Sequence, residues 1–103
     1  MTKRTLVICA THTEAARLFD AMVRAQVGNK GYKNRLEAVT PVGDTVESHL
    51  FRSLRQLNDL DGMRFDEVSI TDNAYKNGNL GSLTKAIYLK GMLTAHIPRE
   101  EPL

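Results

Sequence analysis

Residues 6–14 decide the fold of this chain, and they read Leu6-Val7-Ile8-Cys9-Ala10-Thr11-His12-Thr13-Glu14. The first five residues form an unbroken apolar run, which is typical of a strand buried on both faces. The last four form a Thr-x-x-Glu capping box, which marks the start of a helix. The helix that follows carries apolar residues at helical spacing and should stop near Gly28. A strand covered on both faces needs neighbours on each side, which the rest of the chain must supply.

The same strand-then-helix pattern recurs twice along the chain. We expect strands at 36–40 and 65–71, and helices from Thr45 to about Asn58 and from about Ser82 to Ala95. Asp44 should cap the first of these helices, and residues 72–81 should form a polar loop. The order β-α-β-α-β-α predicts the α/β class, a three-layer sandwich on a three-stranded parallel sheet with strand order 2-1-3 favoured over 3-2-1. Residues 1–97 would form one domain, and residues 98–103 a short flexible tail.

Composition excludes several classes of protein. The longest apolar run is five residues, whereas a membrane-spanning helix needs about 20, so we expect no membrane contact. The start of the chain does not resemble a signal peptide. One cysteine among 103 residues cannot form an internal disulfide and suits a reducing cytoplasm. We therefore expect a cytoplasmic protein in which Cys9 is a small core residue.

Charge is unevenly distributed along the chain. Residues 1–35 hold seven Lys or Arg and two acids, a net +5, whereas residues 36–72 hold three bases and eight acids, a net −5. This asymmetry fits nucleic-acid contact by the basic part or self-association through complementary faces. It also fits an ordinary solvated surface on which the signs mix once the chain folds.

Two surfaces are candidates for nucleic-acid binding. The first is a cationic patch with one aromatic ring, formed by Arg24, Lys30, Tyr32, Lys33 and Arg35. The second supplies hydroxyls and backbone amides at helix starts, from Thr11, Thr13, Thr40 and Gly43. In a parallel sheet the basic loop would lie at the edge opposite the strand carboxyl ends, so one ligand should not touch both surfaces.

Catalysis has only scattered candidates. His12 stands at a strand-to-helix turn, where a general base or a phosphate contact is possible, and three side chains could assist it, namely Asp44, Asp72 and Asn73. The glycines at 78–81 lack the spacing of a phosphate-binding loop. The first strand ends in Thr11 rather than an acid, so paired metal-binding carboxylates are not expected. We assign no catalytic residue, metal or cofactor, and the pattern favours a non-catalytic role.

Three motifs in order resemble those of DEAD-box-type helicases. Residues 6–16 resemble the strand and P-T-R-E-L-A of motif Ia, residues 38–43 resemble the A-T-P-G-R of motif Ib, and residues 65–74 resemble the strand ending in D-E-A of motif II. Phage terminase motors share this RecA-like core. The resemblance implies a truncated RecA-like domain whose Ia and Ib motifs touch a nucleic-acid backbone. The phosphate-binding loop of those enzymes is missing, and Asn73 replaces their water-activating Glu.

These observations leave three functions open. The first is a small non-catalytic binding domain that contacts protein or nucleic-acid partners and self-associates, because a narrow sheet has open edges. The second is a small enzyme acting on a nucleotide or phosphorylated metabolite at the carboxyl edge of the sheet. The third is a structural or assembly subunit.

Overall fold

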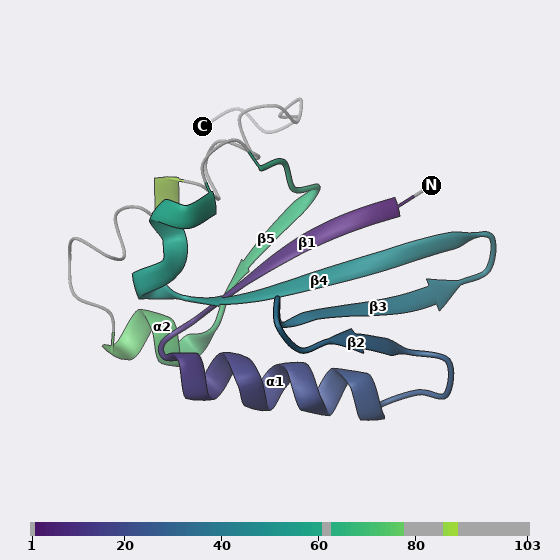
Figure 1. Ribbon diagram of the computed structural model, residues 1–103. Coiled ribbons are helices and arrows are strands. Elements are labelled where there is room, and N and C mark those ends of the chain that lie inside the picture. Colours follow the sequence, from purple (N-terminus) through teal and green to yellow (C-terminus); the bar gives the residue numbers. More distant parts are fainter. Residues whose placement is uncertain (1, 61–62, 78–85, 89–103) are drawn as a thin grey trace.

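A single mixed sheet of five strands organises the molecule. The computed structural model describes residues 2–60, 63–77 and 86–88. The strands lie in the order β2-β3-β4-β1-β5, with helix α1 along one face of the sheet (Figure 1). The elements in chain order are β1 (Thr2–Cys9), α1 (His12–Arg24), β2 (Lys30–Tyr32), β3 (Glu37–Val42), β4 (Thr45–Ser53), the 3-10 helix η1 (Leu54–Leu60), β5 (Glu67–Ile70) and α2 (Asp72–Asn77).

Strand β1 lies inside the sheet, with a parallel neighbour on each side. Leu6 pairs with Leu50 of β4 and with Val68 of β5. Leu6 and Ile8 are fully buried on one face, and Cys9 is fully buried on the other. The unbroken apolar run therefore forms a strand covered on both faces, as predicted.

The three-stranded parallel sheet predicted from the sequence is wrong. Two further strands join through antiparallel pairs, β2 with β3 and β3 with β4. The error begins at Gly43-Asp44, where Val42 pairs with Thr45 across a two-residue hairpin turn. Gly43 has φ +60°, which a glycine at the first central position of such a turn supplies without steric cost. Asp44 is therefore a turn residue and not a helix cap.

The helix predicted from Thr45 to about Asn58 is also wrong. Its first nine residues are strand β4, and its last part is η1. Leu50 and Phe51 are adjacent yet belong to different core clusters on the two faces, which only an extended backbone allows. The parallel RecA-like sheet implied by the helicase-like motif order fails for the same reason, because the described sheet is mixed.

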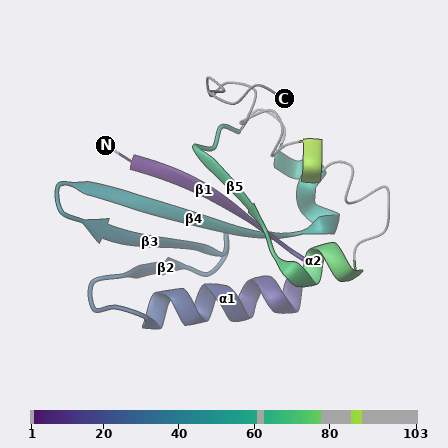
Figure 2. The same cartoon turned by 180° about the vertical axis from the view of Figure 1, so that it is seen from behind.

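Each face of the sheet carries one hydrophobic cluster. The cluster between α1 and the sheet contains the buried residues Cys9, Ala15, Phe19, Leu36, Ala38 and Phe51. The cluster on the other face contains residues of the strands, of η1 and of α2: Leu6, Ile8, Leu50, Leu54, Leu57, Leu60, Val68, Ala74 and Ala86. Figure 2 shows α2 at the end of the sheet, beside the start of α1. The sheet therefore has a buried core on both sides, although its connections differ from those predicted.

The chain after β5 departs from the predicted loop. Residues 72–77 form α2, whose start is capped by the Thr71 hydroxyl accepting a hydrogen bond from Ala74 N. Residues 86–88 of the predicted helix 82–95 are helical. The remainder of that helix, the glycines at 78–81 and the tail 98–103 lie outside the described residues. The helices within the described ranges are too short or too polar to cross a bilayer.

Helix α1 sits unusually close to β2. A Cβ atom on Gly31 would lie 2.7 Å from Val23 Cγ2 and 2.9 Å from Phe19 Cζ, so only glycine fits there without movement. At the end of α1, Asn29 donates a hydrogen bond to Met22 O at 2.7 Å. These contacts fix the β2–β3 hairpin against α1, and they set the position of the loop that joins β2 to β3.

Candidate functional site

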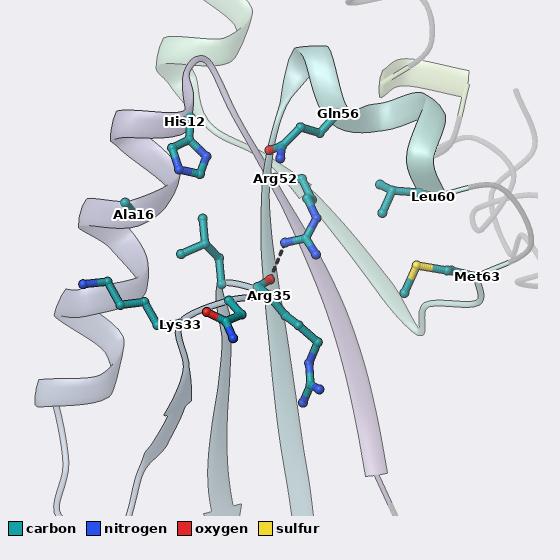
Figure 3. A pocket seen from close by; sticks show the side chains of 10 residues that line it. His12, Ala16, Lys33, Arg35, Arg52, Gln56, Leu60 and Met63 are labelled. Atoms are coloured by element: carbon teal, nitrogen blue, oxygen red, sulfur yellow. Dashed lines mark hydrogen bonds between the residues drawn. The ribbon is translucent and has the colours of Figure 1, made fainter.

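A cavity of about 450 Å³ opens at the end of the sheet where β1 and β4 finish and β3 begins. It lies between α1 and η1, above the loop from β2 to β3 (Figure 3). Six lining residues are polar or cationic: His12, Lys33, Asn34, Arg35, Arg52 and Gln56. Four are apolar: Ala16, Leu36, Leu60 and Met63. None of these ten residues is an acid, so the described lining can attract an anion and repel a cation.

The loop at the base of the cavity is held by its own backbone. Arg35 N donates to Tyr32 O at 3.1 Å, and Leu36 N donates to Lys33 O at 3.2 Å. Leu36 has φ +47°, a conformation that costs a non-glycine residue about 1–2 kcal/mol. Burial of its side chain and a hydrogen bond from Phe51 N to Leu36 O at 3.0 Å hold it there. The loop is therefore a defined turn that presents Lys33, Asn34 and Arg35.

Arg52 ties this loop to the end of β4. Its Nη1 donates to the main-chain oxygen of Arg35, as Figure 3 shows, and also to Phe51 O at 2.7 Å. The guanidinium has several donors in a planar fork, so one arginine can orient a loop and still offer charge to a ligand. Arg52 thus both lines the cavity and positions its floor.

The Arg35 side chain leans toward the exposed surface. Its Nε donates to Glu37 Oε1 at 3.1 Å, and its guanidinium carbon lies 4.8 Å from the centre of the Tyr32 ring. The arginine side chain is mostly exposed, so this ion pair contributes at most about 1 kcal/mol. An anion of higher charge can compete with Glu37 for Arg35, and the Tyr32 ring lies beside it.

Gln56 contributes a donor of fixed orientation. Its Oε1 accepts hydrogen bonds from Ser53 N at 3.1 Å and from Ser53 Oγ at 3.2 Å. Because Ser53 occupies this oxygen, the group of the Gln56 amide that remains for a ligand is Nε2, which carries two N–H donors. Gln56 therefore adds neutral donors to a lining that already holds cations.

His12 comes from the other side of the cavity, as the first residue of α1. Thr11 caps that helix, because its Oγ1 accepts a hydrogen bond from Glu14 N at 3.1 Å, which confirms the predicted cap. The cavity thus joins His12, at the carboxyl end of β1, to Lys33 and Arg35 of the basic loop. The expectation that these lie at opposite edges is wrong, because the antiparallel hairpin returns the loop to the carboxyl end of β4.

A second polar cluster links the start of α1 to the residues that follow β5. Glu14 is buried, and its carboxylate accepts hydrogen bonds from Ala10 N at 2.7 Å, Thr71 Oγ1 at 3.1 Å and Asn73 Nδ2 at 2.5 Å. Burial by itself would raise the pKa of Glu14, but these three hydrogen bonds and nearby Arg17 outweigh it and lower the pKa. Three donors from the protein hold the carboxylate in place, so we assign it a structural role.

Cys9 lies fully buried close to this cluster. Burial raises the pKa of its thiol from 9.0 to about 12, and the negative charge of Glu14 adds to the effect. A thiol that stays protonated is a poor nucleophile. The structure therefore places Cys9 in the core, as the sequence indicated.

The four catalytic candidates are not gathered at one place. His12 lines the cavity, whereas Asp44 lies in the β3–β4 turn at the opposite end of the sheet. Asp72 is exposed at the start of α2, and Asn73 is bound to Glu14. No group of three His, Cys, Asp or Glu among the described residues could hold a metal ion. A catalytic role for these residues stays a prediction.

The nucleic-acid candidates divide between two ends of the molecule. Lys33 and Arg35 line the cavity, with Tyr32 beside Arg35 and with Thr11 and Thr13 flanking His12. The other four lie away from it. Arg24 ends α1, about 18 Å along the helix from His12. Lys30 pairs with Val39 inside the hairpin, while Thr40 and Gly43 lie toward or in the β3–β4 turn.

Sequence reasoning missed several lining residues, including Asn34, Arg52, Gln56 and Met63. One signal could have found two of them. Ser53-Leu54-Arg55-Gln56 is itself a Ser-x-x-Gln capping box, and the Gln56 side chain does reach back to Ser53 N. If this capping box is taken as a helix start, it predicts that the preceding segment ends at Ser53. Arg52 then lies beside the first capped turn.

No protein-family model, curated protein or solved structure matches this chain. The geometry and charge of the cavity are therefore the observations on which a function can be based.

Proposed function

We propose that this chain is a nucleic-acid-binding domain that holds phosphate groups in the cavity between α1 and η1. The observation that carries the proposal is the lining, which includes Lys33, Arg35 and Arg52 from two chain segments and holds no acid among its ten residues. Phosphates are bound in proteins mainly by Arg, Lys and amide donors, because these groups match both their charge and their oxygens.

The uneven charge of the sequence supports the same interpretation. Arg52 comes from the acidic middle of the chain, yet it joins two cations of the basic first third around one hollow. The nearby Glu37 is turned toward Arg35 and Ser48 and does not line the cavity. Folding therefore brings three cationic residues into the described lining of one cavity on a chain whose net charge is only +2.

A salt titration of binding tests this function. Fluorescence anisotropy should show that a labelled single-stranded oligonucleotide binds with an affinity that falls as salt rises, because counterions are released. The double variant Lys33→Ala/Arg35→Ala should bind at least about tenfold more weakly and with a shallower salt dependence. The matched control Arg24→Ala/Lys30→Ala removes the same charge away from the cavity and should bind nearly as well as the native protein. Equal loss in both variants would show attraction by net charge alone and would contradict the proposal.

Self-association and a cytoplasmic location stay predictions. Strands β2 and β5 are the outer strands of the described sheet, and an outer strand can pair with another chain. Light scattering over a range of protein concentrations would measure the oligomeric state.

A further inference from the structure

We infer that the cavity takes one nucleotide of an unpaired strand, with its phosphate on the cationic wall and its base against the apolar wall formed by Leu60 and Met63. This inference rests on the proposed function and names the part of the nucleic acid that enters. It is drawn from the two-sided lining of the cavity, the orientation of its donors and its size.

The two walls come from different elements. Lys33 and Arg35 belong to the loop before β3, whereas Leu60 ends η1 and Met63 follows it. In Figure 3 the Leu60 and Met63 side chains lie on the η1 side, with Arg52 between them and α1. Met63 is 39% exposed and Leu60 only 5%, so Met63 supplies most of the apolar surface that a ligand could reach on this wall. A purely inorganic anion would make no use of this wall, whereas the flat apolar face of a base would cover it.

The polar wall offers donors. Arg52 and Lys33 have only donors, and the Gln56 oxygen is already taken by Ser53, so its free hydrogen-bonding group is the Nε2 amide. Such a wall suits phosphate oxygens and the carbonyl or ring-nitrogen acceptors of a base. It does not suit a cationic ligand.

The size of the cavity favours an unpaired nucleotide over a duplex. A volume of about 450 Å³ falls within the usual range for small-ligand pockets, about 300–1,000 Å³. In a duplex the bases are stacked and paired, so only phosphates and sugars could approach a hollow of this size. An unpaired strand can present a splayed base together with its phosphate, as single-strand-binding proteins exploit.

Competition against the labelled single strand tests this inference with three probes: adenosine 5′-monophosphate, adenosine and inorganic phosphate. The monophosphate should displace the strand at a concentration at least about tenfold lower than either fragment, because it contacts both walls. A duplex of the same sequence should bind at least about tenfold more weakly than the single strand.

The Met63→Ser variant provides the sharper comparison. It should weaken competition by the monophosphate severalfold while leaving competition by inorganic phosphate unchanged, since only the base contacts that wall. Val27→Ser is the matched control. Like Met63, Val27 is apolar; it is fully exposed and lies in the loop between α1 and β2. A monophosphate no better than inorganic phosphate, or a Met63→Ser protein identical to the control, would overturn the inference while leaving salt-dependent strand binding intact. Absence of any strand binding would overturn the proposed function itself, and this inference with it.

Discussion

Arg52 at the end of β4 donates a hydrogen bond to the main-chain oxygen of Arg35 in the loop before β3. These two residues are 17 positions apart, and the bond fixes one wall of the cavity to its floor. The shape of the cavity therefore depends on a side chain that holds backbone in place, and we propose that the same side chain contacts the ligand.

Replacing Arg52 should loosen the loop even without a ligand. In Arg52→Ala, the amides of Arg35 and Leu36 should exchange hydrogen faster, because the turn they form loses its tie to β4. Strand affinity should fall at least about tenfold, because a hydrogen bond to a charged group contributes about 1.5–3 kcal/mol. Arg55→Ala removes an exposed arginine of η1 and serves as the control. Unchanged exchange at Arg35 and Leu36 would show that Arg52 does not position the loop.

Glu14 should make the stability of the fold depend on pH in the acid range. Its pKa is lowered in the folded protein, so it stabilises the fold above its ordinary value of 4.5. That contribution is lost as the pH falls from there through the lower pKa of the folded state. Glu14→Gln should cost about 1–3 kcal/mol at pH 7, because Asn73 Nδ2 then faces an amide in place of a carboxylate.

Urea unfolding at pH 7 and at pH 3 measures this effect. The difference in unfolding free energy between native protein and Glu14→Gln should shrink at the lower pH, because the stabilising contribution of the ionised carboxylate is progressively lost as the pH falls below 4.5. Asp20→Asn changes an exposed carboxylate of the same helix and should behave like the native protein. If the difference in unfolding free energy between native protein and Glu14→Gln is the same at both pH values, the charge of Glu14 is not what stabilises the fold.

Gly31 should tolerate no side chain while α1 stays in place. Gly31→Ala brings a methyl group to within 2.7 Å of Val23 Cγ2, and we expect a loss of about 1–3 kcal/mol in unfolding free energy. In a Val23→Ala background the same change should cost less, because the nearest obstructing atom is gone. Strict additivity of the two changes in urea unfolding would show that α1 and β2 are not in tight contact.

Cys9 should be inert toward thiol reagents in the native state. A pKa of about 12 leaves roughly one thiolate in ten thousand at pH 8, and the side chain is fully buried. Labelling with a thiol-reactive dye should therefore be slow in buffer and fast in denaturant. Fast labelling of the folded protein would show that β1 is more accessible than the structure indicates.

Residues 6–14 were sufficient to predict the end of β1, the cap and the start of α1, although α1 ends at Arg24 and not near Gly28. An unbroken apolar run has one simple interpretation as a doubly covered strand, and a capping box depends only on neighbours in sequence. Both signals are local, and the rest of the chain supplied the neighbours that this strand and this helix need. The carboxylate of Glu14 shows the limit of this reasoning, because its partners Thr71 and Asn73 lie far along the chain.

Strand β4 could not be read correctly from spacing. Its apolar residues Val46 and Leu50 are four positions apart, and Leu54, just beyond the strand, is four positions after Leu50. A spacing of four is close to the helical period of 3.6 and is also twice the strand period of 2. The adjacent pair Leu50 and Phe51 was the informative signal, because two neighbouring buried residues fit a strand covered on both faces.

The candidate site could not be predicted from the sequence for the same reason. Because β4 was predicted to be a helix, the predicted sheet was parallel. In that predicted sheet, the basic loop lay at the wrong edge. Lys33 and Arg35 were identified by their charge alone, but their meeting with His12 and Arg52 follows from antiparallel pairing between β3 and β4. A pairing of that kind depends on the Gly43-Asp44 turn, whose Asp also fits a helix cap.

Chemical-shift mapping of backbone amides during titration with a single-stranded oligonucleotide tests the central claim most directly. We predict that the largest shifts fall on the cavity lining, at residues 12, 33–36, 52 and 56, and that the β3–β4 turn at 42–45 stays unperturbed. Shifts concentrated at that turn or at the Arg24 end of α1, with the cavity residues unchanged, would contradict the account.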